Sequence, residues 1–496
     1  MNVPSDILSC LRPHQREPAT RLLSILESSR AGLDLSVMGS GKTYVAAAVA
    51  CATKKPFLVV CPKIATGIWE RAAKHFGDEF DILNYEKLRT GNTPFGQWSG
   101  GPPPPRIDRE FFVCKSCQQI LELDNLSPCY CHHLGIHCVE TKLKTHRYGQ
   151  FKWCKEVHGV IFDEVHRCGR DSLNSDMLIA ARRQGKHILG LSATVASSPL
   201  QLRAIGYAAS LHHLFDFESW ARSHGCGRLP GLRGLHWLAP KERQLEIMAT
   251  IRAQIIPDHG VRLTEADIPN FPKCDIQAEL YDLPEKDTKE LDALHLEVAG
   301  ALEALEARQR NDIAPEMEAT RILRARQRIE LLKVPLATEL GEDSLEKGFS
   351  VVWFVNFRQT IEELSRRFPN ARVIDGTDES VRNRQRYVDE FQCNKGRELI
   401  VQSECGGVCL SLQDLDGVHP RLGLVMPCHS AVTFRQLAGR LPRDGGLSPA
   451  RYRVLFANKS VEVPMHKALA GKLNNLDALN DSDLRAQNLS ITHLTA

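Results

Sequence analysis

A glycine-rich turn near the start of the chain offers the clearest chemistry. The segment Ser36-Val-Met-Gly-Ser-Gly-Lys-Thr43 follows a short apolar run and precedes a helical stretch. Its glycines let backbone N–H groups approach triphosphate oxygens, and the positive end of the following helix favours the same anion. The pattern predicts that Lys42 reaches the β- and γ-phosphates and that Thr43 binds Mg²⁺. Ser36 stands where glycine is usual, but the second half of the turn is complete, which disfavours a chance glycine turn. The expected ATP-binding residues are Gly39, Ser40, Gly41, Lys42 and Thr43.

Two adjacent carboxylates end an apolar run at Val160-Ile-Phe-Asp-Glu-Val-His166. The carboxyl end of a strand is where α/β sheets place their chemistry. We expect Asp163 to hold Mg²⁺ and Glu164 to orient and deprotonate the water that attacks the γ-phosphate. Adjacent acids at strand ends also arise by chance. The presence of a phosphate-binding loop at Lys42 favours a catalytic role for this pair.

Two further segments contain residues suited to respond to a bound nucleotide. One is a short run over 188–194 that ends in Ser192 and Thr194, which could sense the nucleotide state or form a plain turn. The other carries Arg440 and Arg443, whose spacing places them on one face of an expected helix. Across a cleft, these arginines could stabilise charge on the γ-phosphate in the transition state, and the alternative is a solvated basic turn.

The elements that must position these residues are short β-branched apolar runs alternating with helical stretches, which suit buried parallel strands. Helical spacing also fills 284–340, with a break expected near Pro315. The fold class expected is therefore α/β, with two parallel-sheet lobes joined by a helical segment. The expected domains are a first lobe at 1–210 with an insertion at 100–150, a helical linking region at 211–340, a second lobe at 341–465 and a tail at 466–496.

Composition is that of an ordinary globular protein and disfavours disordered or fibrous architectures. The 496 residues are 43% hydrophobic, and 63 basic against 60 acidic side chains leave a net charge of +3. Any nucleic-acid contact must then come from local patches of charge. No stretch is apolar enough to predict a membrane span, and no targeting segment is apparent. We expect a reducing, cytoplasmic compartment, with a nuclear location also open.

The order of these motifs resembles that of superfamily-two helicases. Asp163-Glu-Val-His166 is similar to their DExH box, and the segment 436–443 is similar to their last motif. The resemblance implies two RecA-like lobes that close around ATP, and a base contact for Gln15 in Leu11-Arg-Pro-His-Gln15. It also implies residues that couple hydrolysis to movement on nucleic acid, namely His166, Ser192, Ala193, Thr194, Gly406, Gly407 and Gln436.

Several other segments are similar to the Swi/Snf branch of double-stranded DNA translocases. They are Phe57 to Lys63 followed by Trp69, Val261 to Thr264, Ile322 to Arg328, and Glu404 to Leu412. The last departs from the branch, because Cys409 and Ser411 stand where glycine and asparagine are usual. The resemblance thus implies a DNA track.

A cysteine-rich window in the insertion offers eight soft or borderline metal ligands, of which tetrahedral zinc needs four. We expect structural Zn²⁺ on Cys114, Cys117, Cys129 and His132, with Cys131, His133, His137 and Cys138 as alternates. A redox pair at Cys114 and Cys117 is the other interpretation. The basic, aromatic segment over 142–155 could bind nucleic acid, or it could be a solvated face over core aromatics.

The function expected is ATP-driven DNA unwinding or translocation on duplex DNA, with ATP and Mg²⁺ as cofactors and nucleic acid as the partner, DNA favoured over RNA. Two alternatives remain. One is an ATP-dependent RNA helicase, because DExH boxes serve both nucleic acids. The other is a nucleotide-dependent nucleic-acid-binding scaffold with little turnover, suggested by Ser36, Cys409 and Ser411.

Overall fold

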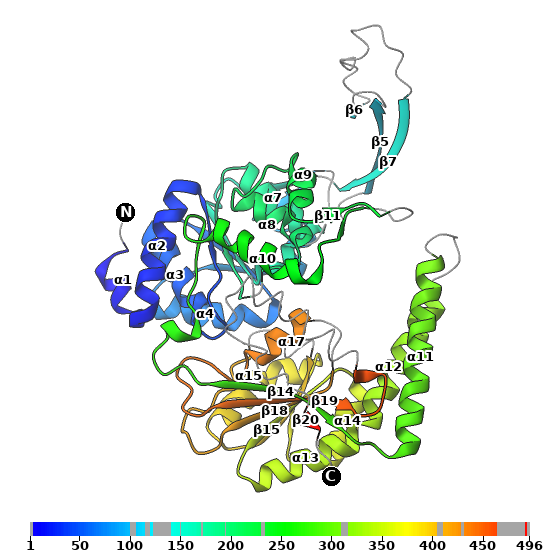
Figure 1. The fold of residues 1–496 in the computed structure, drawn as a ribbon. Helices are drawn as coiled ribbons and strands as arrows, with labels where there is room; N and C mark the ends of the chain where they lie inside the picture. The colour runs from blue at the N-terminus through cyan, green and yellow to red at the C-terminus, as the bar shows by residue number, and fades with distance from the viewer. Residues whose placement is uncertain are drawn as a thin grey trace.

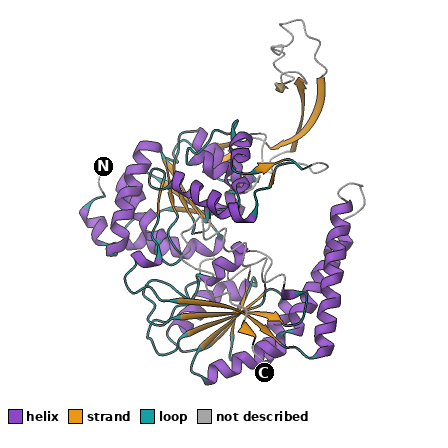
Figure 2. Ribbon diagram, viewed as in Figure 1, coloured by secondary structure: helices purple, strands orange, loops and turns teal. Residues whose placement is uncertain are grey.

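Two α/β lobes make up most of the computed structural model, with one parallel sheet in each (Figure 1). The structure describes residues 3–99, 106–114, 120–122, 140–148, 150–169, 172–193, 195–229, 234–308, 316–403, 410–427, 431–463 and 492–493. The expected α/β fold with two RecA-like parallel-sheet lobes is confirmed. Helices cover the sheets, and helix α17 lies between the two lobes (Figures 1 and 2).

The first lobe contains six parallel strands in the order β13-β1-β10-β9-β2-β3. Their bounds are β1 Ala31–Asp34, β2 Phe57–Cys61, β3 Asp81–Asn84, β9 Gly159–Asp163, β10 His187–Leu191 and β13 Gly260–Val261. The non-sequential order requires crossovers, which the helices supply. The order places β10 between β1, which leads into the glycine-rich turn, and β9, which ends in the acidic pair.

Side chains on both faces of this sheet are buried, which explains the continuous apolar runs. Along β2, Val59 and Cys61 join one core cluster, whereas Leu58 and Val60 join the other. One face is covered by α1 Ser5–Ser9, α2 Pro13–Ser29, α3 Lys42–Thr53 and α4 Thr66–His75. The other is covered mainly by α5 Tyr85–Arg89, α7 Leu173–Arg183, α8 Arg203–Ala208 and α10 Lys241–Ile255.

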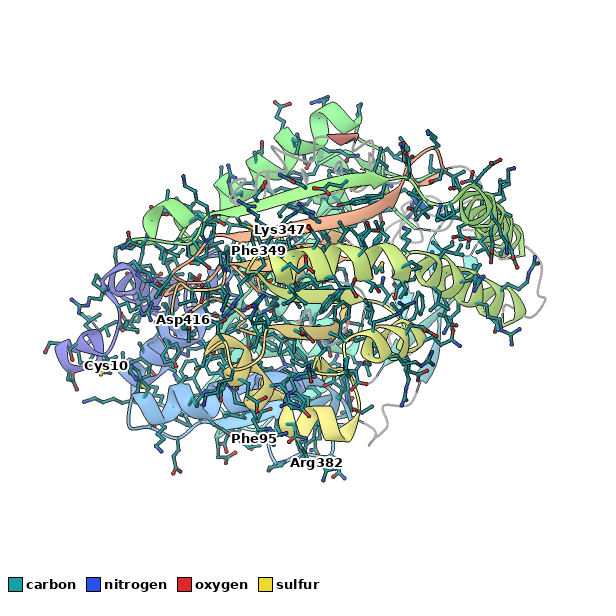
Figure 3. All side chains as sticks on the ribbon, turned by 90° about the horizontal axis from the view of Figure 1, so that it is seen from below. Cys10, Phe95, Lys347, Phe349, Arg382 and Asp416 are labelled. Carbon is teal, nitrogen blue, oxygen red and sulfur yellow. The ribbon has the colours of Figure 1, made fainter. Side chains whose placement is uncertain are left out.

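The second lobe contains seven parallel strands in the order β16-β17-β15-β18-β19-β14-β20. Their bounds are β14 Cys274–Tyr281, β15 Ser350–Val355, β16 Arg372–Ile374, β17 Glu398–Gln402, β18 Arg421–Val425, β19 Ala450–Ala457 and β20 Thr492–His493. Helices α15 Asp378–Gln392 and α17 Ala431–Ala438 pack on one face, and α13 Val334–Glu346 and α14 Arg358–Arg367 pack on the other. Figure 3 shows Lys347 beside Phe349, where α13 turns into β15.

The region between the lobes contributes a strand to each of the two large sheets and also forms a pair of helices. Helix α9 Phe217–Ser223 and the short strands β11 Cys226–Gly227 and β12 His236–Trp237 precede α10. Residues 260–261 then form β13 of the first sheet, and 274–281 form β14 of the second. Helices α11 Glu285–Arg308 and α12 Glu316–Leu332 pack together, and Pro315, where a break is expected, lies outside the described residues. The domain limits given above remain a prediction.

The insertion extends away from the first lobe as a three-stranded antiparallel sheet in the order β6-β5-β7 (Figure 1). Its strands are β5 Arg106–Cys114, β6 Ile120–Glu122 and β7 Glu140–Tyr148. At its base, β4 Gly96–Trp98 pairs with β8 Phe151–Trp153. None of the helices that the structure describes combines the length and the apolar character needed to cross a bilayer.

Candidate active site between the lobes

The glycine-rich turn has the backbone that a phosphate-binding loop requires. Gly39 and Gly41 have φ angles of 81° and 88°, a left-handed conformation that glycine adopts without steric penalty. A Cβ atom on Gly41 would lie 2.1 Å from Nε2 of Gln15, so this position also lacks space for a side chain. Lys42 begins α3, whose N-terminal N–H groups face the turn.

Lys42 is partly buried, and its side chain folds back into the turn that it follows. Its Nζ donates hydrogen bonds to the carbonyl oxygens of Ser36 at 2.8 Å and Val37 at 3.0 Å. Burial lowers the pKa of Lys42, and the charges of Asp34 and Glu164 oppose that shift. The ammonium group therefore lies among carbonyl oxygens that phosphate oxygens could replace.

Gln15 contacts the same turn from helix α2. Its Nε2 donates to the carbonyl oxygen of Ser40 at 3.0 Å, and its Oε1 accepts from the backbone N–H of Arg12 at 3.1 Å. The residue thus forms a capping box at the start of α2 and supports the loop. The structure places Gln15 at the expected site, with a contact to the loop backbone that the sequence did not predict.

Asp163 ends β9 and is fixed by two aromatic residues. Nε1 of Trp69 donates to its Oδ2 at 2.9 Å, and the hydroxyl of Tyr85 donates to its backbone oxygen at 2.9 Å. Burial, followed by the charge of Glu164, raises the pKa of Asp163 to about 6, although Trp69 and Lys42 oppose the shift. A carboxylate that is costly to bury alone has a strong tendency to bind a cation.

Glu164 adopts a left-handed backbone conformation, with φ 56° and ψ 54°, which is uncommon for a residue with a side chain. Its carboxylate lies 3.3 Å from Nδ1 of His166. Burial alone would raise the pKa of Glu164, but His166, Arg440 and Lys42 together lower it to about 2. The carboxylate is therefore ionised.

His166 connects Glu164 to the second lobe. Its Nδ1 also lies 3.0 Å from Oγ of Ser192, and its Nε2 lies 3.1 Å from Nε2 of Gln436. Because an amide nitrogen only donates, the lone pair belongs on Nε2 and the ring proton on Nδ1, facing Glu164. A continuous polar path therefore leads from the acidic pair in one lobe to Gln436 in the other. Ala193 is buried next to Ser192, and Thr194 lies outside the described residues.

The two arginines come from the turn after α17, so the prediction that they share a helical face is wrong. The helix ends at Ala438, and the segment that follows passes close to the first lobe. A Cβ on Gly439 would lie 2.4 Å from Sδ of Met38, and one on Gly39 would lie 2.8 Å from Cγ of Arg443. Arg440 is 3% exposed and acts electrostatically on Glu164. The structure thus brings Arg440 and Arg443 to the loop and the acidic pair.

Sequence reasoning missed several residues at this site. Asp444 forms ion pairs across the lobes, with Arg12 and, at 3.5 Å, with His14. Tyr85 was not identified, and Trp69 was named only through a family resemblance, without its contact to Asp163. Asp34 was also missed, although a single acid in the apolar run Ala31 to Val37 was a usable signal.

Other predicted residues cannot be placed at the site. Gly406 and Gly407 lie outside the described residues, as do Cys117, Cys129, Cys131, His132, His133, His137 and Cys138. Cys114 ends β5, of which only the backbone is described. Within the described part of the chain, no group of three or more candidate ligands could hold a metal ion. Phe151 and Trp153 belong to the core of the first lobe, which supports core aromatics over base stacking for these two rings.

The site has features that fit a nucleotide and Mg²⁺. Oγ of Ser40 is buried and has no hydrogen-bond partner among the described residues, which leaves a donor available inside the loop. Thr43 lies in the first turn of α3, and Asp163 presents a carboxylate from β9. A hydroxyl and a carboxylate are oxygen ligands of the kind that Mg²⁺ prefers.

Two comparisons with known proteins agree with this geometry. The family described as type III restriction enzyme, res subunit, matches residues 9–197. A protein of Acanthamoeba polyphaga mimivirus, provisionally named an ATP-dependent RNA helicase, is 29% identical over 501 residues, covering 97% of this chain and 85% of the relative. Together with the two parallel-sheet lobes, these similarities support a superfamily-two helicase, and hence a nucleic-acid-dependent ATPase.

Proposed function

We propose that this protein is an ATP-driven translocase on duplex DNA, in which each ATP hydrolysed between the lobes opens and closes them once. The observation that carries the proposal is the polar path from Glu164 through His166 to Gln436. A path of this kind makes the hydrolytic carboxylate sensitive to the position of the second lobe. Cyclic closure would then step the protein along its track.

Residues of both lobes take part in the proposed hydrolysis step. Glu164 accepts a proton from water, whose oxygen attacks the γ-phosphorus while the bond to the bridging oxygen breaks and its electron pair leaves with ADP. Lys42 holds the β- and γ-phosphates, and Thr43 and Asp163 would hold Mg²⁺, which neutralises charge on the phosphate oxygens. Arg440 and Arg443 stabilise the charge of the transferred phosphoryl group.

Duplex DNA is the proposed track because of the segments similar to the Swi/Snf branch. One of them, residues 261–264, lies directly beside the phosphate loop. Leu35 and Val37 donate backbone hydrogen bonds to Val261 and Leu263, each at 2.9 Å, and Leu263 N–H donates to Oγ of Ser36 at 2.9 Å. A nucleotide-dependent movement of the loop would therefore reach the chain segment that leads into the second lobe.

RNA is the second candidate track, because the mimivirus relative is provisionally named an RNA helicase. Mg²⁺-dependent ATP hydrolysis separates the candidates when it is measured with duplex DNA, single-stranded DNA and RNA. Salt must be low and fixed, because phosphate contacts weaken steeply as salt rises. We expect the largest stimulation with duplex DNA, and the Lys42→Ala chain is the control for contaminating ATPases.

Each alternative result has a distinct meaning. Stimulation by RNA alone would contradict the DNA assignment and support the RNA candidate. A preference for single-stranded DNA would indicate strand separation rather than duplex tracking. ATP binding without hydrolysis on every polynucleotide would identify a nucleotide-dependent scaffold.

A further inference from the structure

Asp34 is an acidic residue buried beneath the phosphate loop. It is 1% exposed and ends β1, between Leu33 and Leu35, which are core residues. Carboxylates are rarely buried to this extent without a partner that compensates for lost hydration. The residues paired with Asp34 on the two neighbouring strands, Leu191 and Val261, are both apolar.

The contacts of Asp34 fix the start of the loop but leave part of its carboxylate available. Its Oδ1 accepts the backbone N–H of Ser36 at 2.9 Å, and its backbone oxygen accepts the N–H of Ser192 at 3.1 Å. Its Oδ2 is buried and has no hydrogen-bond partner in the part of the chain that the structure describes. Oδ1 therefore fixes the backbone of Ser36, and Oδ2 can interact with nearby charges.

Burial raises the pKa of Asp34, and the positive charge of Lys42 opposes that shift and favours the carboxylate. Among the charges that favour the ammonium form of Lys42, Asp34 contributes most, ahead of Glu164 and Asp163. Nζ of Lys42 donates to the carbonyl oxygen of Ser36, and Asp34 accepts the backbone N–H of the same residue. Asp34 thus attracts Lys42 from the strand beneath the loop.

We propose that Asp34 is a positioning residue that draws Lys42 back into the loop when no nucleotide is bound, and thereby weakens nucleotide binding and speeds product release. The inference rests on the proposed role of Lys42 in holding phosphates. Binding of a triphosphate requires Lys42 to leave the carbonyl oxygens of Ser36 and Val37 against the attraction of Asp34. The negative charge of Asp34 beneath the loop also repels the phosphates, so both effects favour release.

Replacing Asp34 by Asn tests the charge with little change in geometry, because the amide oxygen can still accept from Ser36 N–H. We expect the Kd for MgADP to fall by about tenfold, which corresponds to about 1.4 kcal/mol. The kcat for stimulated ATP hydrolysis should fall with it, because tighter product binding slows release. Asp81→Asn, the same change at the exposed start of β3, should leave both quantities unchanged.

A double-mutant cycle distinguishes this role from a structural one. In a Lys42→Met background, D34N should tighten MgADP binding clearly less than in the unmodified chain, because the attraction to Lys42 is already absent and only the repulsion of the phosphates is removed. A merely structural Asp34 would weaken binding in both backgrounds. If the D34N chain does not fold, Asp34→Ser is also neutral, keeps an acceptor for Ser36 N–H, and should tighten binding in the same way.

Unchanged or weaker MgADP binding in a folded D34N or D34S chain would overturn the proposed role of Asp34 and leave the nucleotide site intact. Failure of the unmodified chain to bind MgADP or MgATP would instead overturn the nucleotide site, and with it the proposed function.

Discussion

At the scale of single residues, Asp163 and Glu164 are adjacent in the chain, yet their surroundings shift their pKa values in opposite directions. Burial and the charge of Glu164 raise the pKa of Asp163 to about 6, whereas His166, Arg440 and Lys42 lower that of Glu164 to about 2 despite burial. Such divergence separates the tasks of two acids. The low pKa keeps Glu164 ionised, and the raised pKa of Asp163 marks a carboxylate that a bound cation would stabilise.

Replacing Trp69 should lower ATP hydrolysis more than it lowers the stability of the fold. Trp69→Phe removes the indole N–H that Asp163 accepts but keeps a buried ring. A hydrogen bond to a charged group contributes about 1.5–3 kcal/mol, so we expect kcat/KM for ATP to fall by about ten- to a hundredfold. Trp98→Phe is the matched control, because Trp98 is equally buried and donates to the backbone oxygen of Arg89. Equal kinetic losses in the two variants would contradict the assigned role.

The stacked histidines at the amino ends of the central strands β9 and β10 should make stability depend on pH. The rings of His158 and His187 are 4.4 Å apart, and burial, then the charges of His158, Lys55 and Arg30, lower the pKa of His187 from 6.5 to about 4. The unfolded chain therefore binds more protons between these two values, and stability contributed by neutral His187 is lost as pH falls from about 6.5 to 4.

Urea unfolding at pH 7 and pH 4.5 measures this loss. We expect His187→Phe to lose less stability between the two pH values than the unmodified chain, because phenylalanine stacks but does not take up a proton. Identical losses in the two chains would show that His187 is not responsible.

At the scale of elements, a buried ion pair anchors the base of the helical pair α11–α12. Nζ of Lys333 lies 2.5 Å from the carboxylate of Glu462, and the two side chains are 2% and 1% exposed. His295 on α11 approaches the same carboxylate at 3.3 Å, and the backbone N–H of Ala457 donates to it at 2.7 Å. The pair connects α11, α12 and the end of β19.

Removing one partner should be costly because the other charge stays buried. We expect Lys333→Met to lower the free energy of unfolding by about 3–5 kcal/mol, and Lys333→Met with Glu462→Gln to recover part of that loss. Lys347→Met is the control, because its pair with Asp343 is exposed and worth about 1 kcal/mol or less. Similar denaturation midpoints for the two single variants would contradict a buried-charge effect.

The sequence predicted strands most accurately where a run of apolar residues was uninterrupted. The runs at 57–60, 160–162, 188–191, 351–354 and 399–401 lie in parallel strands, and the run at 424–426 begins in β18 and ends one residue beyond it. Strands buried on both faces have few polar positions, which makes such runs easy to recognise. Strand β14 escaped prediction because Asp275, Gln277 and Glu279 interrupt it. Its place depends on pairing with β19, which is far away in the chain.

The site was predictable in its residue types but not in its connections. Lys42, Asp163, Glu164 and Gln436 followed from local motifs, whereas the bond from Trp69 to Asp163 joins residues 94 positions apart. The helical face assigned to Arg440 failed because spacing alone does not reveal the close passage of Gly439 over Met38. Tertiary packing decided both outcomes.

At the scale of the whole molecule, polar contacts between described residues join the lobes beside the loop. Gln436 reaches His166, and Asp444 pairs with Arg12 at the start of α2. Both second-lobe residues lie close in sequence to Arg440. The segment that contacts the first lobe is therefore the one that also places Arg440 near Glu164.

The ion pair between Arg12 and Asp444 should contribute modestly to this closure. Because Arg12 is 56% exposed, solvent screens the pair, and we expect about 0.2–1 kcal/mol. Asp444→Asn should raise the KM for ATP by up to about fivefold at low salt and less at high salt. In a double-mutant cycle with Arg12→Ala the two effects should not add, and strict additivity would show that the pair does not couple the lobes.

The central claim is that both lobes supply the ATP hydrolysis site, and Arg440→Ala tests it most directly. Steady-state hydrolysis by this variant with duplex DNA should fall by about 10³-fold or more, the effect of removing an arginine that stabilises phosphoryl transfer. Binding of MgATP should persist, because Lys42 and the loop remain. Hydrolysis at the rate of the unmodified chain would contradict the claim, since the first lobe would then be sufficient for the chemistry.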